Sequence, residues 1–89
     1  PAAFTNLVGL YPTYGTHSRY GVIAFASSAD QVGPITRDVY DNALIASILS
    51  GQDAHDQSSL TTSPQDYTTT LDGKLATGLK VGIIKDALE

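Results

Sequence analysis

The chain has 89 residues, of which 42% are hydrophobic and 16% are charged, so it can form at most one small domain. Five Lys and Arg against nine Asp and Glu give a net charge of -4. This balance argues against non-specific binding to nucleic-acid phosphates, which needs a basic face. No apolar run approaches the roughly 18 residues of a membrane-spanning helix. The absence of Cys excludes disulfides, thiol catalysis and thiolate-bound zinc.

The chain contains no Met and begins at Pro1. A translated protein ordinarily starts with Met or with a secretion signal, and no signal of that kind is visible. We therefore expect residues 1–89 to be an internal fragment of a single larger domain, with no complete domain boundary inside the chain. Such a fragment leaves strand edges unpaired, so self-association of the isolated piece is also expected.

The first third of the chain, residues 1–35, carries two short apolar runs among Gly and Tyr residues. The runs are residues 7–10 and 20–25, and neither alternates between apolar and polar positions. Periodicity does not separate buried strands from tightly packed loops, so both remain open here. Pro12 ends any strand after the first run or confines it to a sheet edge.

One helix is predicted over residues 37–50. Thr36 is suited to cap its N-terminus, and Asp38 falls in the first turn, where the helix dipole favours a carboxylate. Gly51 is a suitable residue just beyond the C-terminus. One helical face, widened by Val39, Ala46 and Leu49, predicts a well-buried helix; its members at three- and four-residue spacing are Tyr40, Ala43, Leu44, Ser47 and Ile48.

The second half begins with a polar segment, residues 52–70, that has the composition of a surface loop. Residues 66–71 are predicted to form a short helix, and residues 79–84 alternate as a strand does. This order of strands, helix, loop and strand is typical of a slice of an α/β or α+β protein.

The chain offers little complete chemistry. Asp53, His55 and Asp56 could ligate a metal, but three ligands in one flexible loop are more often solvated, and no metal site is predicted. The eight glycines form neither a dinucleotide-binding nor a phosphate-binding loop and more simply serve tight turns. Asp38 and Asp41 share a helical face that we expect to be solvated.

A serine-hydrolase triad is also not predicted. Ser18, Ser27 and Ser28 lie near His17 in sequence, yet no G-x-S-x-G elbow is present. A nucleophilic serine further needs a base within hydrogen-bond reach and an oxyanion hole. The paired serines are more simply explained as packing or capping groups near Asp30.

Several segments resemble one stretch of the amidase signature family over essentially the whole chain. The clearest are Pro1-Ala2-Ala3-Phe4, Pro12-Thr13-Tyr14-Gly15, Ser18-Arg19-Tyr20-Gly21, Ala24-Phe25-Ala26-Ser27-Ser28 and Asp30-Gln31-Val32-Gly33-Pro34. The similarity is strong over residues 1–51 and looser over 52–77. Within the family, these segments are most similar to the subunit that supplies ammonia inside a tRNA-dependent amidotransferase.

The resemblance implies a fold and a division of labour. The fold would be a slice of the amidase signature fold, a mixed β-sheet flanked by helices. The family hydrolyses amides with a Ser–cis-Ser–Lys triad, all of it expected upstream of Pro1. No catalytic, substrate-binding or metal-binding residue is therefore assigned to this chain. Arg19, Tyr20, Asp30 and Gln31 are expected to form an active-site scaffold. In it, Asp30 and Gln31 would orient backbone near the site, and Arg19 would pair with a buried carboxylate.

The resemblance also implies partners. The parent protein would hydrolyse glutamine so that ammonia converts Glu-tRNA(Gln) to Gln-tRNA(Gln), with ATP and magnesium held by a partner subunit and no cofactor in this chain. Its partners would be the B and C subunits and, indirectly, tRNA, in the cytoplasm or an organellar matrix. The isolated piece is expected to be inactive. Two alternatives stay open, namely another amidase acting on small amides and a non-catalytic interaction module.

Overall fold

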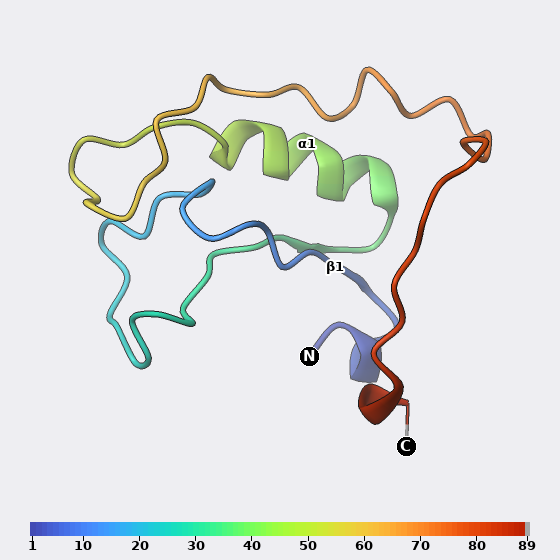
Figure 1. Ribbon diagram of the computed structural model, residues 1–89, viewed down its shortest axis with the longest axis horizontal. Helices are drawn as coiled ribbons and strands as arrows, with labels where there is room; N and C mark the ends of the chain where they lie inside the picture. Colours follow the sequence, from blue (N-terminus) through green and yellow to red (C-terminus); the bar gives the residue numbers. More distant parts are fainter. Residues whose placement is uncertain (89) are drawn as a thin grey trace.

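A computed structural model describes residues 1–88 and combines one helix with a small sheet. Strands β1 and β2 pair antiparallel, with Val8 opposite Thr36 and Gly9 opposite Ile35, and helix α1 packs on this pair (Figure 1). The arrangement agrees with an α/β slice. The elements in chain order are the 3-10 turn η1 (Ala3–Thr5), β1 (Val8–Gly9), β2 (Ile35–Thr36), α1 (Val39–Leu49) and the 3-10 turn η2 (Lys85–Ala87).

Helix α1 confirms the predicted helix, with a different N-cap. The Asp38 carboxylate accepts a hydrogen bond from the Asp41 backbone N–H at 2.8 Å, so Asp38 is the cap and not a first-turn residue. Thr36, predicted as the cap, belongs to β2, and its hydroxyl donates to the Asp38 carbonyl at 2.7 Å. Gly51 follows the C-terminal cap with a φ of +124°, which suits a residue without Cβ.

The predicted buried face of α1 is right at Ala46 and wrong at Leu44 and Ile48. The helix turns Asn42 and Ala46 towards the strands, with exposed fractions of 5% and 1%, whereas Leu44 and Ile48 are exposed. The Asn42 side-chain amide donates to the carbonyls of Val8 at 3.0 Å and Pro34 at 3.2 Å. The helix carries apolar residues of its own on all sides, so the sequence pattern does not select one face. The two hydrogen bonds of the Asn42 amide fix which side meets the sheet.

Two further predicted elements are absent from residues 1–88. Residues 66–71 form turns instead of a helix, because the Asp66 carboxylate accepts hydrogen bonds from the Thr68 backbone N–H and hydroxyl. Residues 79–84 are not a strand; no neighbouring strand pairs with them. The alternation of apolar residues in this segment is compatible with a strand. A strand forms only when a neighbouring strand completes its backbone hydrogen bonds.

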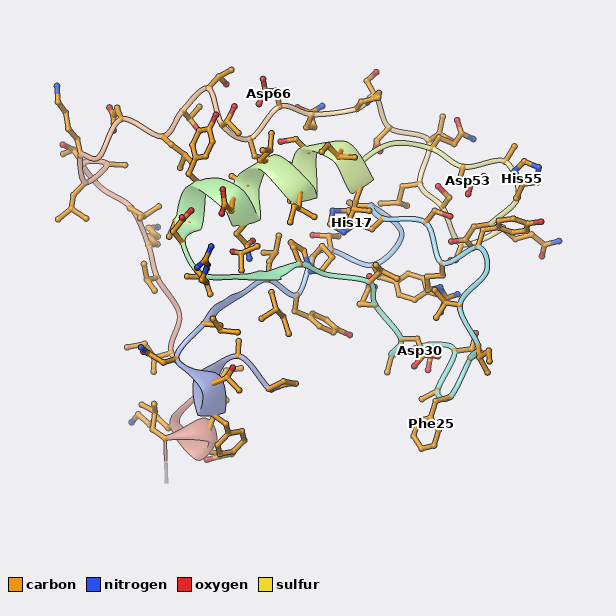
Figure 2. The ribbon with its side chains drawn as sticks, turned by 180° about the vertical axis from the view of Figure 1, so that it is seen from behind. His17, Phe25, Asp30, Asp53, His55 and Asp66 are labelled. Carbon is orange, nitrogen blue, oxygen red and sulfur yellow. The ribbon has the colours of Figure 1, made fainter. Side chains whose placement is uncertain are left out.

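The two apolar runs of the first third have different outcomes. The first contains β1, as a strand interpretation allowed. The second, residues 20–25, is neither a strand nor a buried loop, and its Ile23 and Phe25 side chains are 95% and 99% exposed. The Phe25 ring points away from the rest of the chain (Figure 2). The second run forms the start of a loop over residues 20–30, which we call the protruding loop.

The chain buries little of its surface. Its accessible area is 7355 Å², whereas a folded monomer of 9.3 kDa has about 5,000 Å². Its radius of gyration is 14.5 Å, against about 12 Å for a compact domain of this length. Roughly 2,400 Å² of surface is therefore exposed beyond what a self-contained domain of this size leaves open.

Among the described helices, none is long and apolar enough to cross a membrane.

Candidate functional site

Two loops distant in sequence meet beside the end of α1. Residues 13–19 run next to residues 50–60, and the Leu60 backbone N–H donates to the Gly15 carbonyl at 2.8 Å. His17 and Ser50 form an isolated antiparallel bridge. Gly15 has a φ of +85°, and a Cβ there would lie 2.5 Å from the Ser58 carbonyl oxygen, so this close approach requires glycine. We call this region the loop junction.

Two carboxylates bind the loop junction together. Asp53 accepts a hydrogen bond from the Ser18 hydroxyl at 2.5 Å, and Asp56 accepts one from the Arg19 backbone N–H at 2.9 Å. The Asp56 carboxylate also accepts hydrogen bonds from the Ser58 hydroxyl at 2.7 Å and the Ser58 backbone N–H at 2.9 Å. The polar loop is therefore ordered by its own acidic side chains.

The same hydrogen bonds shift the acidity of these groups. The Ser18 hydroxyl, followed by the His55 backbone amide, lowers the pKa of Asp53 below its ordinary value. The Ser58 hydroxyl, followed by the Arg19 backbone amide, lowers the pKa of Asp56. Each donor stabilises the ionised form. Both carboxylates are consequently acceptors at neutral pH, which makes them structural groups and not proton donors.

Arg19 connects the loop junction to the protruding loop. Its guanidinium donates to the Ser27 carbonyl, to the Ser58 hydroxyl at 3.2 Å and to the Tyr14 hydroxyl at 3.0 Å. The guanidinium carbon also lies 5.0 Å from the centre of the Tyr14 ring, in cation–π contact. Sequence reasoning suggested an ion pair between Arg19 and a buried carboxylate; within residues 1–88 the guanidinium meets neutral oxygens, and Asp56 takes the backbone N–H instead.

Asp30 orders the protruding loop; its predicted role near an active site stays a prediction. Its carboxylate accepts hydrogen bonds from the backbone N–H groups of Phe25 at 2.9 Å and Ala26 at 3.1 Å. These hydrogen bonds hold a bend at Phe25 and Ala26, and residues 27–29 form a turn, so the loop tip keeps its shape without β-pairing and Phe25 stays exposed.

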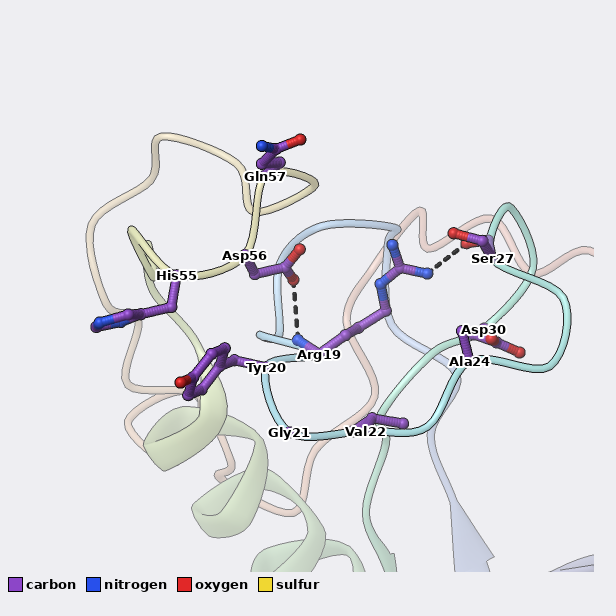
Figure 3. A pocket seen from close by; sticks show the side chains of 10 residues that line it. All are labelled: Arg19, Tyr20, Gly21, Val22, Ala24, Ser27, Asp30, His55, Asp56 and Gln57. Atoms are coloured by element: carbon purple, nitrogen blue, oxygen red, sulfur yellow. Dashed lines mark hydrogen bonds between the residues drawn. The ribbon is translucent and has the colours of Figure 1, made fainter.

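A cleft of about 250 Å³ lies between the protruding loop and residues 55–57 of the polar loop (Figure 3). Tyr20 stands at its rim, where its ring centre is 4.9 Å from that of His55. The cleft thus brings together three of the four predicted scaffold residues. Its lining comprises Arg19, Tyr20, Gly21, Val22, Ala24, Ser27, Asp30, His55, Asp56 and Gln57.

Gln31, the fourth predicted scaffold residue, lies elsewhere. It lines a separate hollow together with residues 1–3 and the strand β1 residue Gly9. Both polar atoms of its side-chain amide are buried and have no hydrogen-bond partner among the described residues. A buried amide without a partner is unfavourable by about 1–3 kcal/mol, so Gln31 is the one scaffold residue whose side chain this part of the chain leaves unsatisfied.

The candidates for catalysis and metal binding are not assembled. The His17 ring is 1% exposed, and its Nδ1 lies 2.7 Å from the Val32 carbonyl. Ser18 donates to Asp53 and not to His17, so the hypothetical triad does not form. The Asp53 Oδ1 and His55 Nδ1 atoms are 3.0 Å apart. In the portion of the chain that the structure describes, however, no three His, Asp or Glu side chains come together closely enough to bind one metal ion.

Sequence reasoning missed the structural roles of His17 and of the Ser18–Asp53 pair. His17 was noted only as a possible base, yet it is the largest fully buried side chain described. Ser18 and Asp53 are 35 residues apart, and no local pattern relates positions at that separation. Such contacts could have been found only by knowing that the loops of residues 13–19 and 50–60 run side by side.

The comparisons with known proteins agree with the resemblance. The sequence model of the amidase family matches residues 1–89, and the chain belongs to that family.

Its relatives carry one common name. The chain is similar to the A subunit of glutamyl-tRNA(Gln) amidotransferase from Halothermothrix orenii, with 53% identity over 83 residues, covering 93% of this chain and 17% of the relative. It is also similar to the proteins of that name from Rubrobacter xylanophilus, with 51% identity over 89 residues (100% and 18% covered), and Staphylococcus carnosus, with 46% over 88 residues (99% and 18%). The chain thus spans less than a fifth of these relatives' length. No solved structure is matched.

Proposed function

We propose that the chain is part of the A subunit of a glutamyl-tRNA(Gln) amidotransferase, the glutaminase of that complex. The observation that carries the proposal is the identity of 46–53% along nearly the whole chain to relatives of that name. In this function, glutamine is hydrolysed to glutamate and ammonia. The ammonia then converts Glu-tRNA(Gln) to Gln-tRNA(Gln).

The role proposed for residues 1–89 is to support the active site and not to supply its reacting groups. The Ser–cis-Ser–Lys triad of the family is assigned to the chain upstream of Pro1. The three lysines of this chain that follow α1, Lys74, Lys80 and Lys85, are exposed. A catalytic lysine needs a pKa lowered by burial or by a neighbouring cation, which exposed positions do not favour.

The supporting residues act through the backbone. Asp30 holds two consecutive backbone N–H groups, and Arg19 ties the protruding loop to the loop junction. Gln31 borders the hollow next to residues 1–3, which follow the expected nucleophile segment most closely in sequence. Its unsatisfied amide is suited to hold the backbone there. The wider fold would be the mixed sheet with flanking helices that the family resemblance implies.

The parent reaction follows from established physical chemistry. A lysine with a lowered pKa acts as the base through the bridging serine, which removes the proton from the nucleophilic serine. Backbone N–H groups stabilise the oxyanion as the amide carbonyl is attacked. Ammonia leaves, and water then hydrolyses the acyl-enzyme to glutamate. The proton removed from the serine is returned to the leaving nitrogen.

The proposal includes partners and a location. ATP and magnesium belong to a partner subunit that activates Glu-tRNA(Gln), together with a third subunit, and tRNA is met through those partners. The net charge of -4 is in keeping with a subunit that does not bind tRNA phosphates directly. The complex would work in the cytoplasm or an organellar matrix.

Two measurements test the proposal. Sequencing the coding DNA upstream of Pro1 should reveal, in frame, a Gly/Ser-rich segment with the nucleophilic serine. The full-length protein, purified with its partner subunits, should then form Gln-tRNA(Gln) from Glu-tRNA(Gln) only when glutamine or ammonia is supplied. Hydrolysis of small amides without any transfer to tRNA would instead identify another kind of amidase. A start codon directly before Pro1 and a stop after Glu89 would favour an interaction module.

A further inference from the structure

Helix α1 carries a second apolar face on the side away from the sheet. Leu44 and Ile48 lie there, with exposed fractions of 42% and 74%. The opposite side holds the buried Asn42 and Ala46. A helix that is apolar on all sides is normally buried on all sides. We call Leu44 and Ile48 the outer face.

The other flanks of α1 are already occupied by this chain. The segment of residues 63–74 runs along one flank (Figure 1), where the Tyr67 backbone N–H donates to the Ser47 hydroxyl at 2.8 Å. The Gln65 backbone N–H likewise donates to the Ser50 hydroxyl at 2.9 Å. The sheet covers the Asn42 side. Within residues 1–88, no other segment covers Leu44 and Ile48, and these apolar side chains stay in solvent, as Val39 and Tyr40 at the start of the helix also do.

The amount of exposed surface indicates what covers this face. The chain exposes roughly 2,400 Å² more than a self-contained domain of its mass, and one partner in a standard protein interface buries about 800 Å². One docked copy would account for about a third of the excess. The remaining excess surface needs contacts on several sides of the chain, as a segment has inside one larger folded domain. The relatives are more than five times longer than the matched segment, so they contain enough chain to provide such contacts.

We propose that the outer face of α1 is an internal packing surface, covered by the part of the amidase polypeptide that lies outside residues 1–89. Leu44 and Ile48 are one helical turn apart and present adjacent apolar side chains with no charge between them on that ridge. The occupant is therefore an apolar helix or sheet face of the same protein. The inference uses family membership and does not depend on which amide the parent hydrolyses.

Cysteine accessibility tests this proposal directly, because the chain contains no Cys of its own. Leu44→Cys and Ile48→Cys are made separately in the full-length protein, in a background freed of its other cysteines. Gln57→Cys, in the exposed polar loop, is the matched control. Labelling rates with a maleimide are measured in native buffer and in guanidinium chloride.

The proposal predicts that both outer-face thiols react at least about 100-fold more slowly in the native full-length protein than in denaturant. The Gln57→Cys control should react at similar rates in both solutions. Rapid labelling of the native full-length protein would overturn the proposal. So would protection that depends on protein concentration and accompanies dimer formation, since the occupant would then be a second copy.

A second measurement avoids substitution altogether. Hydrogen exchange of the unsubstituted full-length protein should be slow in the peptide that covers residues 39–49, and fast exchange there would also overturn the proposal. Glutamine hydrolysis by the same preparation is measured separately. Slow exchange without glutamine hydrolysis would leave this inference intact and reject the proposed function, so the two can fail independently.

Discussion

Asn42 fastens α1 to the sheet, and its replacement is the most direct test of the packing described here. The residue is 5% exposed, and its amide donates to the carbonyls of Val8 and Pro34. Asn42→Ala leaves both acceptors without this donor. The Pro34 carbonyl keeps its hydrogen bond from the Leu10 backbone N–H at 3.2 Å, so the cost is the loss of two hydrogen bonds and not two unsatisfied carbonyls. At about 0.5–1.5 kcal/mol for each bond, the free energy of unfolding should fall by about 1–3 kcal/mol. Asn42→Asp should cost more, because it places a carboxylate against two carbonyl oxygens.

The assay is urea unfolding of the full-length protein, followed by circular dichroism. The shift of the midpoint, multiplied by the slope of the unfolding free energy against urea, gives the change in stability. Gln52→Ala, an exposed position just beyond α1, is the control and should change stability by less than about 0.5 kcal/mol. A change of that small size for Asn42→Ala would refute the argument that the amide fixes the helix orientation.

Three further predictions concern the loop junction. The pKa of Asp56 is lowered in the folded protein. Its contribution to stability is therefore present above the unfolded pKa of about 3.9 and is lost as the pH falls through the folded pKa. The amide NMR shift of Arg19 should report a titration midpoint below about 3.9, and a higher midpoint would contradict the geometry. Arg19→Ala in the full-length protein should lower soluble yield more than specific activity, because the side chain joins two loops; normal yield with lost activity would reject the supporting role. Gly15→Ala should destabilise by at least about 1 kcal/mol, because the backbone has a positive φ and the new Cβ meets Ser58; an unchanged urea midpoint would show that this close approach is absent.

The local features of the chain were predictable from its sequence. The helix was located to within two residues at its start and one at its end, because apolar spacing and Gly51 are local signals. The polar segment after it was recognised as a loop from composition alone.

The features that failed depend on groups far away in the chain. Residues 79–84 alternate as a strand does, but pairing is a property of two segments, and among residues 1–88 the structure gives them no partner. Leu44 and Ile48 were wrongly assigned to the buried side of α1, whereas Ala46 was assigned correctly. All three are apolar, so the sequence pattern does not separate them, and the Asn42 amide decides which side meets the sheet. The Ser18–Asp53 hydrogen bond joins positions whose proximity follows from tertiary structure and not from spacing.

The central claim is that this chain supports an amide-hydrolysing site without containing it. The most direct measurement compares glutamine hydrolysis by the purified 89-residue chain and by the full-length protein, with ammonia release as the readout. The account predicts turnover by the full-length protein and none by the shorter chain. Glutamine turnover by the shorter chain that survives repeated purification would contradict it, because a complete site would then lie within these residues.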